Sequence, residues 1–96
     1  MKVDEMLAKI GFNKVYEDIR RVHYERYDEK YDYHHTVCIE RRSVWNGFRL
    51  QSYDEQLIDK KGVGNTNVAL STYEMKLFLK KMQQKELEYA SHRMWI

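Results

Sequence analysis

The segment from Tyr31 to Glu40 constrains the fold most, because its residues alternate regularly between two sides. One side reads Tyr31, Tyr33, His35, Val37 and Ile39, and the other reads Asp32, His34, Thr36, Cys38 and Glu40. Alternation with a period of two predicts a half-buried β-strand. The segments around it, from Val15 to Tyr53, can pair with it as antiparallel neighbours. The side that contains His34 and Cys38 is polar enough to face water.

Length and composition indicate one folded domain over residues 1–96. The chain has 43% hydrophobic and 33% charged residues, which is typical of a globular protein. Its single cysteine, Cys38, excludes an internal disulfide and favours a reducing compartment. Asp4 and Glu5 stand where a signal peptide would be apolar, and no run approaches the ~18 apolar residues of a membrane span. We therefore expect a cytoplasmic protein with no membrane partner.

A short helix is predicted over residues 4–10. Its apolar face consists of Val3, Met6, Leu7 and Ile10. Gly11 follows at the position of a C-terminal cap, and Phe12 is placed to fold back on the helix. Such a short helix must dock on the sheet to be stable.

The residues from Asn13 to Tyr27 indicate a strand with an irregularity. Val22 and Tyr24 share one face, whereas Val15 and Ile19 join them only if the strand bulges near residues 18–21. We favour that bulge. A turn at 28–30 then leads into the alternating strand.

The reversal after Glu40 has two candidate registers. A tight turn at 41–42 would pair Ile39 with Val44, whereas a type I′ turn at 46–47 would pair Trp45 with Phe48. Both registers keep Phe48 and Leu50 on the buried face. We favour the turn at 41–42 because the strand after it is then long enough to pair with residues 33–39.

The end of the chain is predicted as a loop, a short strand and a long helix. Residues 54–67 lose periodicity and form the loop, and a strand over 67–70 follows. Ser71 and Glu74 form a capping box that opens a helix to about Ser91. The inward stripe is predicted as Met75, Phe78, Leu79 and Met82, and the opposite side as Lys76, Lys80, Lys81, Gln83, Gln84 and Lys85.

The fold class that follows is α+β. It consists of a short N-terminal helix, a three- to four-stranded antiparallel meander, and a long C-terminal amphipathic helix packed on one face.

The sequence offers little for catalysis or metal binding. His34 and His35 point to opposite faces of a strand, and His34 and Cys38 are ~13 Å apart along it, so they cannot share an ion. Cys38 lacks the helix N-terminus or basic neighbour that activates a thiol. The glycines at 62 and 64 lack the rest of a phosphate-binding loop. We predict no catalytic residue, no metal and no cofactor, and hence a non-enzymatic protein.

Two surfaces are candidates for recognition. Tyrosine interleaved with charge is typical of protein contacts, and the predicted partner-binding residues are Tyr24, Arg26, Tyr27, Asp28, Glu29, Tyr31 and Asp32. The 54–67 loop is a second contact region. The alternative is a nucleic-acid-binding protein, with phosphate contacts from Arg41, Arg42, Lys76, Lys80 and Lys81. A homodimer could form through Trp95 and Ile96, or through a free sheet edge.

The order of these elements resembles a known group of proteins. The quoted features are the helix ending Ile10-Gly11-Phe12, the tyrosine-rich meander, and Leu70-Ser71-Thr72-Tyr73-Glu74-Met75 opening a Lys-rich helix. They are similar to small uncharacterised proteins encoded by phages and prophages of low-GC Gram-positive bacteria. The resemblance implies an accessory protein in the host cytoplasm that works by binding a host or phage protein. Inhibition of a host defence or regulatory protein is one action that it implies.

Overall fold

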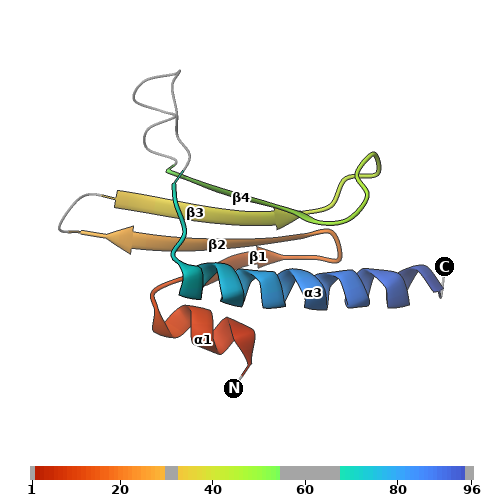
Figure 1. Cartoon of the computed structure of the whole chain (residues 1–96), viewed down its shortest axis with the longest axis horizontal. Coiled ribbons are helices and arrows are strands. Elements are labelled where there is room, and N and C mark those ends of the chain that lie inside the picture. Colours follow the sequence, from red (N-terminus) through yellow and green to blue (C-terminus); the bar gives the residue numbers. More distant parts are fainter. Residues whose placement is uncertain (1, 30–32, 55–67, 95–96) are drawn as a thin grey trace.

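The computed structural model describes residues 2–29, 33–54 and 68–94. In order the elements are α1 (Val3–Lys9), β1 (Asn13–Glu17), β2 (Arg21–Asp28), β3 (Tyr33–Glu40), β4 (Arg49–Asp54) and α3 (Thr72–Met94). The strands form one antiparallel sheet in the order β1-β2-β3-β4, and α1 and α3 lie against it (Figure 1). This is the predicted α+β fold, with four strands in the meander.

Helix α1 ends as predicted. Gly11 has φ +96°, a conformation that favours glycine. The Gly11 N–H donates to the Ala8 carbonyl at 3.0 Å, and the Phe12 N–H donates to the Leu7 carbonyl at 2.9 Å. These two bonds are those of a Schellman cap. They turn Phe12 back under the helix, where its side chain is fully buried.

The predicted continuous strand from Asn13 to Tyr27 is wrong, because the chain reverses between β1 and β2. One Asp18 carboxylate oxygen accepts the backbone N–H groups of Arg20 and Arg21, both at 2.8 Å. An aspartate that bonds the backbone two and three residues ahead stabilises a turn. The sequence signal at 18–21 was thus a turn and not a bulge.

A bulge does occur, but it lies in β1 between Lys14 and Tyr16. On either side of it Lys14 pairs with Tyr24, and Glu17 pairs with Val22. Directly paired residues share a sheet face, so both charged side chains lie on the same face as the core. Val15 is left exposed, and its predicted inward placement is wrong.

Both predicted registers after Glu40 are wrong. Strand β4 pairs Ile39 with Leu50 and Glu40 with Arg49, so residues 41–48 form a longer connection. The Phe48 N–H donates to a Glu86 carboxylate oxygen at 2.6 Å, which fixes the connection against α3 instead of within a tight hairpin. Phe48 is nevertheless buried and Leu50 packs on the core, as predicted.

The segment before α3 is not the strand predicted for 67–70, since residues 68–70 are irregular and residue 67 lies outside the described part of the chain. The capping box is confirmed. The Glu74 N–H donates to Ser71 Oγ at 3.1 Å, and the Ser71 N–H donates to Glu74 Oε1 at 2.8 Å. The helix continues three residues beyond the predicted end at Ser91.

One core joins both helices to the inner face of the sheet. Its buried members are Val3, Leu7, Phe12, Val22, Tyr24, Val37, Ile39, Phe48, Leu77 and Phe78. Phe78 makes edge contacts with the rings of Phe12 and Tyr24, at centroid distances of 5.1 and 5.5 Å. Burial of aromatic side chains in such geometry is a main source of stability for a small domain.

The predicted apolar stripe of α3 is only partly correct. Phe78 is buried and Met82 packs on the core, but Met75 and Leu79 are 51% and 55% exposed. The helix is rotated relative to the prediction, because its inward face includes two lysines.

Lys81 and Lys85 are these two inward lysines, and their predicted position on the outer side is wrong. Lys85 Nζ lies 3.2 Å from Glu17 Oε2 and also donates to the Asp18 carbonyl. Lys81 Nζ lies 3.2 Å from carboxylate oxygens of both Asp4 and Glu17. We call the group that joins α1, β1 and α3 through these contacts the ionic network; its members are Asp4, Lys14, Glu17, Lys81 and Lys85.

We predict that Lys85→Met lowers the free energy of unfolding by about 2–4 kcal/mol. The change removes a fully buried cation and leaves the Asp18 carbonyl without its donor. Urea denaturation measures the effect. Lys80→Met, five residues earlier on the exposed side of α3, is the matched control and should change stability by less than about 0.5 kcal/mol. Equal effects of the two substitutions would contradict a structural role for the buried ammonium.

Candidate functional site

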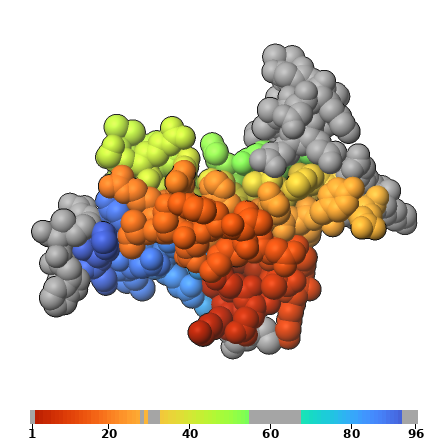
Figure 2. Space-filling view, turned by 180° about the vertical axis from the view of Figure 1, so that it is seen from behind, coloured from red at the N-terminus to blue at the C-terminus, as the bar shows by residue number. Residues whose placement is uncertain are grey.

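The two faces of the sheet differ in what covers them. Both helices pack on the inner face, and Figure 2 shows the other side, where strands lie at the molecular surface. We call this the open face. Its residues follow from the strand pairing and are Asn13, Tyr16, Arg21, His23, Glu25, Tyr27, His34, Thr36, Cys38, Glu40, Arg49, Gln51 and Tyr53.

Aromatic pairs across neighbouring strands flank the centre of the open face. The Tyr27 and His34 rings are 5.9 Å apart between β2 and β3, and the Tyr16 and His23 rings are 5.9 Å apart between β1 and β2. His34 Nε2 also lies 3.6 Å from a Glu25 carboxylate oxygen. Tyr16 and Tyr27 both remain exposed, so each pair presents an aromatic surface to a partner.

The centre of the open face is less exposed to solvent than predicted. Thr36 and Cys38 are 3% and 5% exposed. Both belong to β3, an inner strand whose side chains are flanked by the larger side chains of β2 and β4. The prediction of a wet face is therefore wrong at these two positions.

Two polar atoms at this centre have no hydrogen-bond partner among the residues that the structure describes. Within the described part of the chain, Thr36 Oγ1 and His23 Nε2 are buried and unpaired. Thr36 pairs with Glu25 and His23 pairs with Cys38, so the two lie on a diagonal of the same face. An unsatisfied buried polar group costs about 1–3 kcal/mol. A ligand that displaced a neighbouring side chain and bonded to these atoms would remove that cost.

Cys38 is poorly suited to nucleophilic chemistry. Burial raises the pKa of its thiol to about 11, and the nearby Glu40 carboxylate acts in the same direction. The thiolate is the reactive form, so almost none is present near neutral pH. Among residues 2–29, 33–54 and 68–94, no group of three or more His, Cys, Asp or Glu side chains is placed to hold a metal ion.

The predicted hairpin residues have different positions in the structure. Tyr24 is fully buried, and its hydroxyl donates to Asp4 at 2.5 Å. Arg26 lies on the inner face, where it pairs with Glu74 at 2.6 Å and stacks 4.1 Å above the Phe12 ring. Neither residue is presented on the open face. Tyr27 and Glu29 are exposed, whereas Tyr31, Asp32, the side chain of Asp28 and residues 55–67 of the predicted loop lie outside what the structure describes.

The residues of the nucleic-acid alternative do not form one surface. Lys81 is buried in the ionic network, and Arg41 stacks on Tyr89 near the C-terminal end of α3. Lys76 and Lys80 are exposed near the N-terminal end of the helix. At about 1.5 Å per residue, Lys76 lies roughly 20 Å along the helix from Tyr89. Arg41 and Arg42 are thus separated from the exposed lysines. The predicted dimer contacts Trp95 and Ile96 lie outside the described residues.

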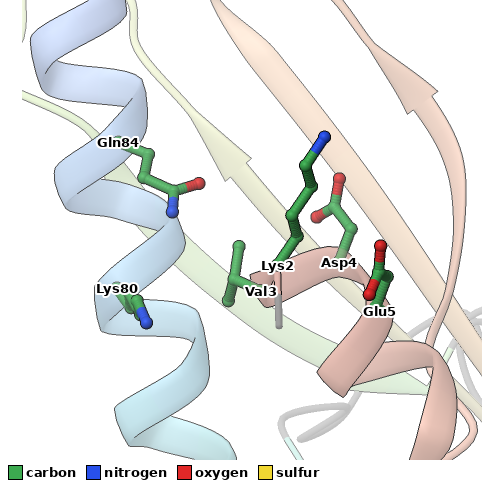
Figure 3. A pocket seen from close by; sticks show the side chains of 6 residues that line it. All are labelled: Lys2, Val3, Asp4, Glu5, Lys80 and Gln84. Atoms are coloured by element: carbon green, nitrogen blue, oxygen red, sulfur yellow. The ribbon is translucent and has the colours of Figure 1, made fainter.

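A pocket of about 450 Å³ lies between α1 and α3. Figure 3 shows Lys80 and Gln84 on α3 facing residues at the start of α1, with Val3 between the two helices. Its Asp4 belongs to the ionic network. Burial works against ionisation there, but the hydrogen bonds from Tyr24 and Lys14 and the charge of Lys81 lower the pKa of Asp4. The Asp4 carboxylate is therefore used in contacts that hold the fold together.

His35 is another buried titratable group, and it is also structural. Its Nδ1 lies 3.3 Å from Arg26 Nη2 and its Nε2 lies 2.5 Å from Ser52 Oγ. Since an arginine can only donate, Nδ1 accepts and Nε2 carries the proton. Burial and the charge of Arg26 lower the pKa of His35, so the ring is neutral near pH 7.

Sequence reasoning missed Tyr16 and His23 as residues of the candidate surface. Their pairing depends on the bulge at Lys14–Tyr16, which shifts the register of β1. The only available signal was the turn-forming Asp18, which would have ended the strand before Arg21.

Comparisons with known proteins found no relative of this chain. No protein-family model, curated protein or solved structure matches the chain. No helix within the described residues is both long and apolar enough to span a bilayer. Support for the candidate site therefore comes from the geometry of this chain alone.

We predict that Cys38 reacts with a thiol reagent at least about 100-fold more slowly in the native protein than in the denatured protein near pH 8. The pKa of about 11, compared with an ordinary value of 9.0, accounts for about this factor, and burial adds to it. Reaction with a chromogenic disulfide measures both rates. Equal rates in the two states would contradict this placement of Cys38.

We also predict that stability falls as the pH is lowered from 7 to about 5.5. The pKa of His35 is lower in the folded state, so the unfolded chain binds a proton more readily. The stabilisation that comes from neutral His35 is fully present above pH 6.5, the ordinary pKa of a histidine. It is lost as the pH falls from there towards the lower pKa of His35 in the folded state. The free energy of unfolding should change by less than about 1.4 kcal/mol per pH unit, which is the limit for the uptake of one proton.

Urea denaturation at several pH values tests this linkage, with His35→Gln compared against His34→Gln. The substitution at 35 should flatten the slope, and the one at 34 should keep most of it. The carboxylates with lowered pKa values, Asp4, Glu17 and Glu74, titrate below this window and do not obscure it. An unchanged slope in His35→Gln would contradict the assignment.

Proposed function

We propose that the protein is a non-enzymatic binding module whose contact surface is the open face of the sheet. The observation that carries this proposal is the buried and unpaired pair of atoms, Thr36 Oγ1 and His23 Nε2, at the centre of a face that the helices leave uncovered. Folding alone gives these atoms no partner within the described residues. A bound molecule that displaced a covering side chain would supply a donor and an acceptor for them.

The side chains around this centre favour a protein as the partner. Tyrosine has a large contact area, a polar hydroxyl and few rotatable bonds, so it binds protein surfaces at a small entropic cost. Tyr16 and Tyr27 are exposed on the open face beside histidine rings. Opposite charges lie among them, including Glu25, Arg21 and Arg49. An aromatic centre with mixed charge around it is typical of protein interfaces.

The end of the open face near the β2–β3 hairpin is the strongest part of this surface. Tyr27, His34 and Glu25 make contacts with one another there. They replace Tyr24 and Arg26 of the sequence-based hypothesis, which are used in the core. Tyr27 is the residue that both versions share.

The resemblance to phage and prophage accessory proteins bears on the identity of the partner. We propose a host protein in the bacterial cytoplasm, with inhibition of a defence or regulatory protein as the resulting action. The open face requires no catalytic group for this function, because occupation of a surface is sufficient to block another contact.

The test is affinity capture from a low-GC Gram-positive lysate with three forms of the protein. We expect the wild type to recover a specific host protein, and Tyr27→Ala/His34→Ala to lose it because the aromatic pair is removed. Tyr73→Ala/Leu79→Ala is the matched control, since both side chains are exposed on α3 and not on the sheet. It should retain the captured protein.

Two results would contradict the open-face proposal. One is recovery of the same proteins by all three forms, and the other is recovery of no specific protein by any of them. Loss of binding in the α3 control alone would place the contact on the helix. Thermal unfolding of each variant should show that the proteins compared are folded.

A further inference from the structure

A second surface of interest lies at the end of the sheet away from the β2–β3 hairpin. A pocket of about 430 Å³ forms there between the β1–β2 turn and the residues that follow β3. Figures 1 and 2 show that these two segments lie side by side at one end of the molecule. Four arginines line the pocket, namely Arg20, Arg21, Arg41 and Arg42.

The backbone fixes the two arginine pairs next to each other. The Arg41 N–H donates to the Arg20 carbonyl at 2.9 Å. The first pair belongs to the turn that Asp18 stabilises, and the second pair directly follows β3. The backbone of the sheet therefore holds the two arginine pairs next to each other, whatever the conformations of their side chains.

The acidic residues of the pocket only partly neutralise the arginines. Asp18 and Glu40 are the carboxylates among the lining residues, and Glu86 also pairs with Arg41, so one positive charge remains in excess. One Asp18 oxygen accepts two backbone N–H groups, and the other accepts the Tyr16 hydroxyl at 2.5 Å. This carboxylate is largely used by the turn itself.

The arginines differ in how firmly they are held. Arg41 is 16% exposed in its side chain; it stacks 4.5 Å above the Tyr89 ring and lies 4.0 Å from Glu86. Arg42 is 65% exposed in its side chain and makes one 3.3 Å pair with Glu40. Arg20 is exposed and has no ion pair with any residue that the structure describes. Arg42 also lies over the Trp45 ring at 5.2 Å, and Arg21 pairs with Asp18 at 3.6 Å, so Arg20 is the one of the four without an ion pair among the described residues.

We propose that this pocket binds a phosphate monoester. Guanidinium groups donate pairs of parallel hydrogen bonds that match phosphate oxygens, and a monoester has a charge of about −1.5 to −2 near pH 7. The excess positive charge of the pocket favours binding of that anion. The hydroxyl of Ser43, which also lines the pocket, offers a further donor.

This site does not depend on the open-face proposal. The arginines that the test alters, Arg20 and Arg42, are not members of the open face. Tyr27 and His34, which the capture experiment removes, lie at the opposite end of the strands. A negative result in one experiment therefore does not contradict the proposal that the other experiment tests.

The test is an NMR titration of the isotopically labelled full chain with inorganic phosphate near neutral pH. We expect saturable shifts confined to the backbone amides of residues 18–21 and 40–43. Sodium chloride at the same ionic strength should not reproduce them. Arg20→Gln/Arg42→Gln should weaken phosphate binding at least tenfold. Lys76→Gln/Lys80→Gln removes the same number of exposed positive charges from α3 and should leave the affinity within about twofold.

Two further ligands identify the source of the phosphate. Adenosine 5′-monophosphate should bind at least as tightly as inorganic phosphate and shift the same amides. If a single-stranded oligonucleotide binds more tightly than the monophosphate, and the arginine variant loses that binding, the pocket accepts phosphate but its natural ligand is a nucleic-acid strand, which overturns the monoester assignment.

Three results would overturn the site itself. These are the absence of saturable shifts with phosphate, their reproduction by chloride, and an equal loss of affinity in the arginine and lysine variants. The last result would indicate general charge attraction and not a pocket.

Discussion

The ionic network between the two helices and β1 is the interaction on which the rest of the fold depends. Lys85 is fully buried and lies against Glu17, and Lys81 joins the same carboxylate to Asp4 on α1. A buried charge without a partner is strongly destabilising, so these lysines fix the rotation of α3 about its axis. That rotation presents Leu77 and Phe78 to the sheet and leaves Leu79 exposed. The network thus determines which apolar residues form the core.

The sequence predicted the elements well because their signals are local. The Schellman cap at Gly11, the capping box at Ser71 and the alternation along β3 each depend on residues close together in the chain. The rotation of α3 could not be predicted in this way. A helical pattern ranks lysine as an outward residue, and only the acids of α1 and β1, more than 60 positions earlier, make inward lysines favourable.

The same contrast holds for the candidate surface. Three tyrosines near the predicted hairpin, Tyr24, Tyr27 and Tyr31, were assigned to recognition together, because composition does not separate the two faces of a strand. The register does separate them: Tyr24 pairs on the inner face, whereas Tyr27 pairs with His34 on the open face. The bulge in β1 and the long connection before β4 instead set the registers of the two outer strands, where Asp18 and Glu86 accept backbone N–H groups.

The distribution of polar contacts gives a reason to look for function on one side of the sheet. On the inner face, Arg26 bonds Glu74 and approaches His35, and His35 in turn approaches Ser52, so the polar groups there are used within the fold. On the open face, Thr36 and His23 each retain a buried atom without a partner in the described residues. Buried polar atoms without a partner are rare in natural proteins, so these two mark the open face as a place to look for a ligand. Arg21 and Glu40 belong both to this face and to the arginine pocket, so a partner lying along the strands would reach the pocket at one end. A phosphate group on that partner would then add charge recognition to an otherwise aromatic contact.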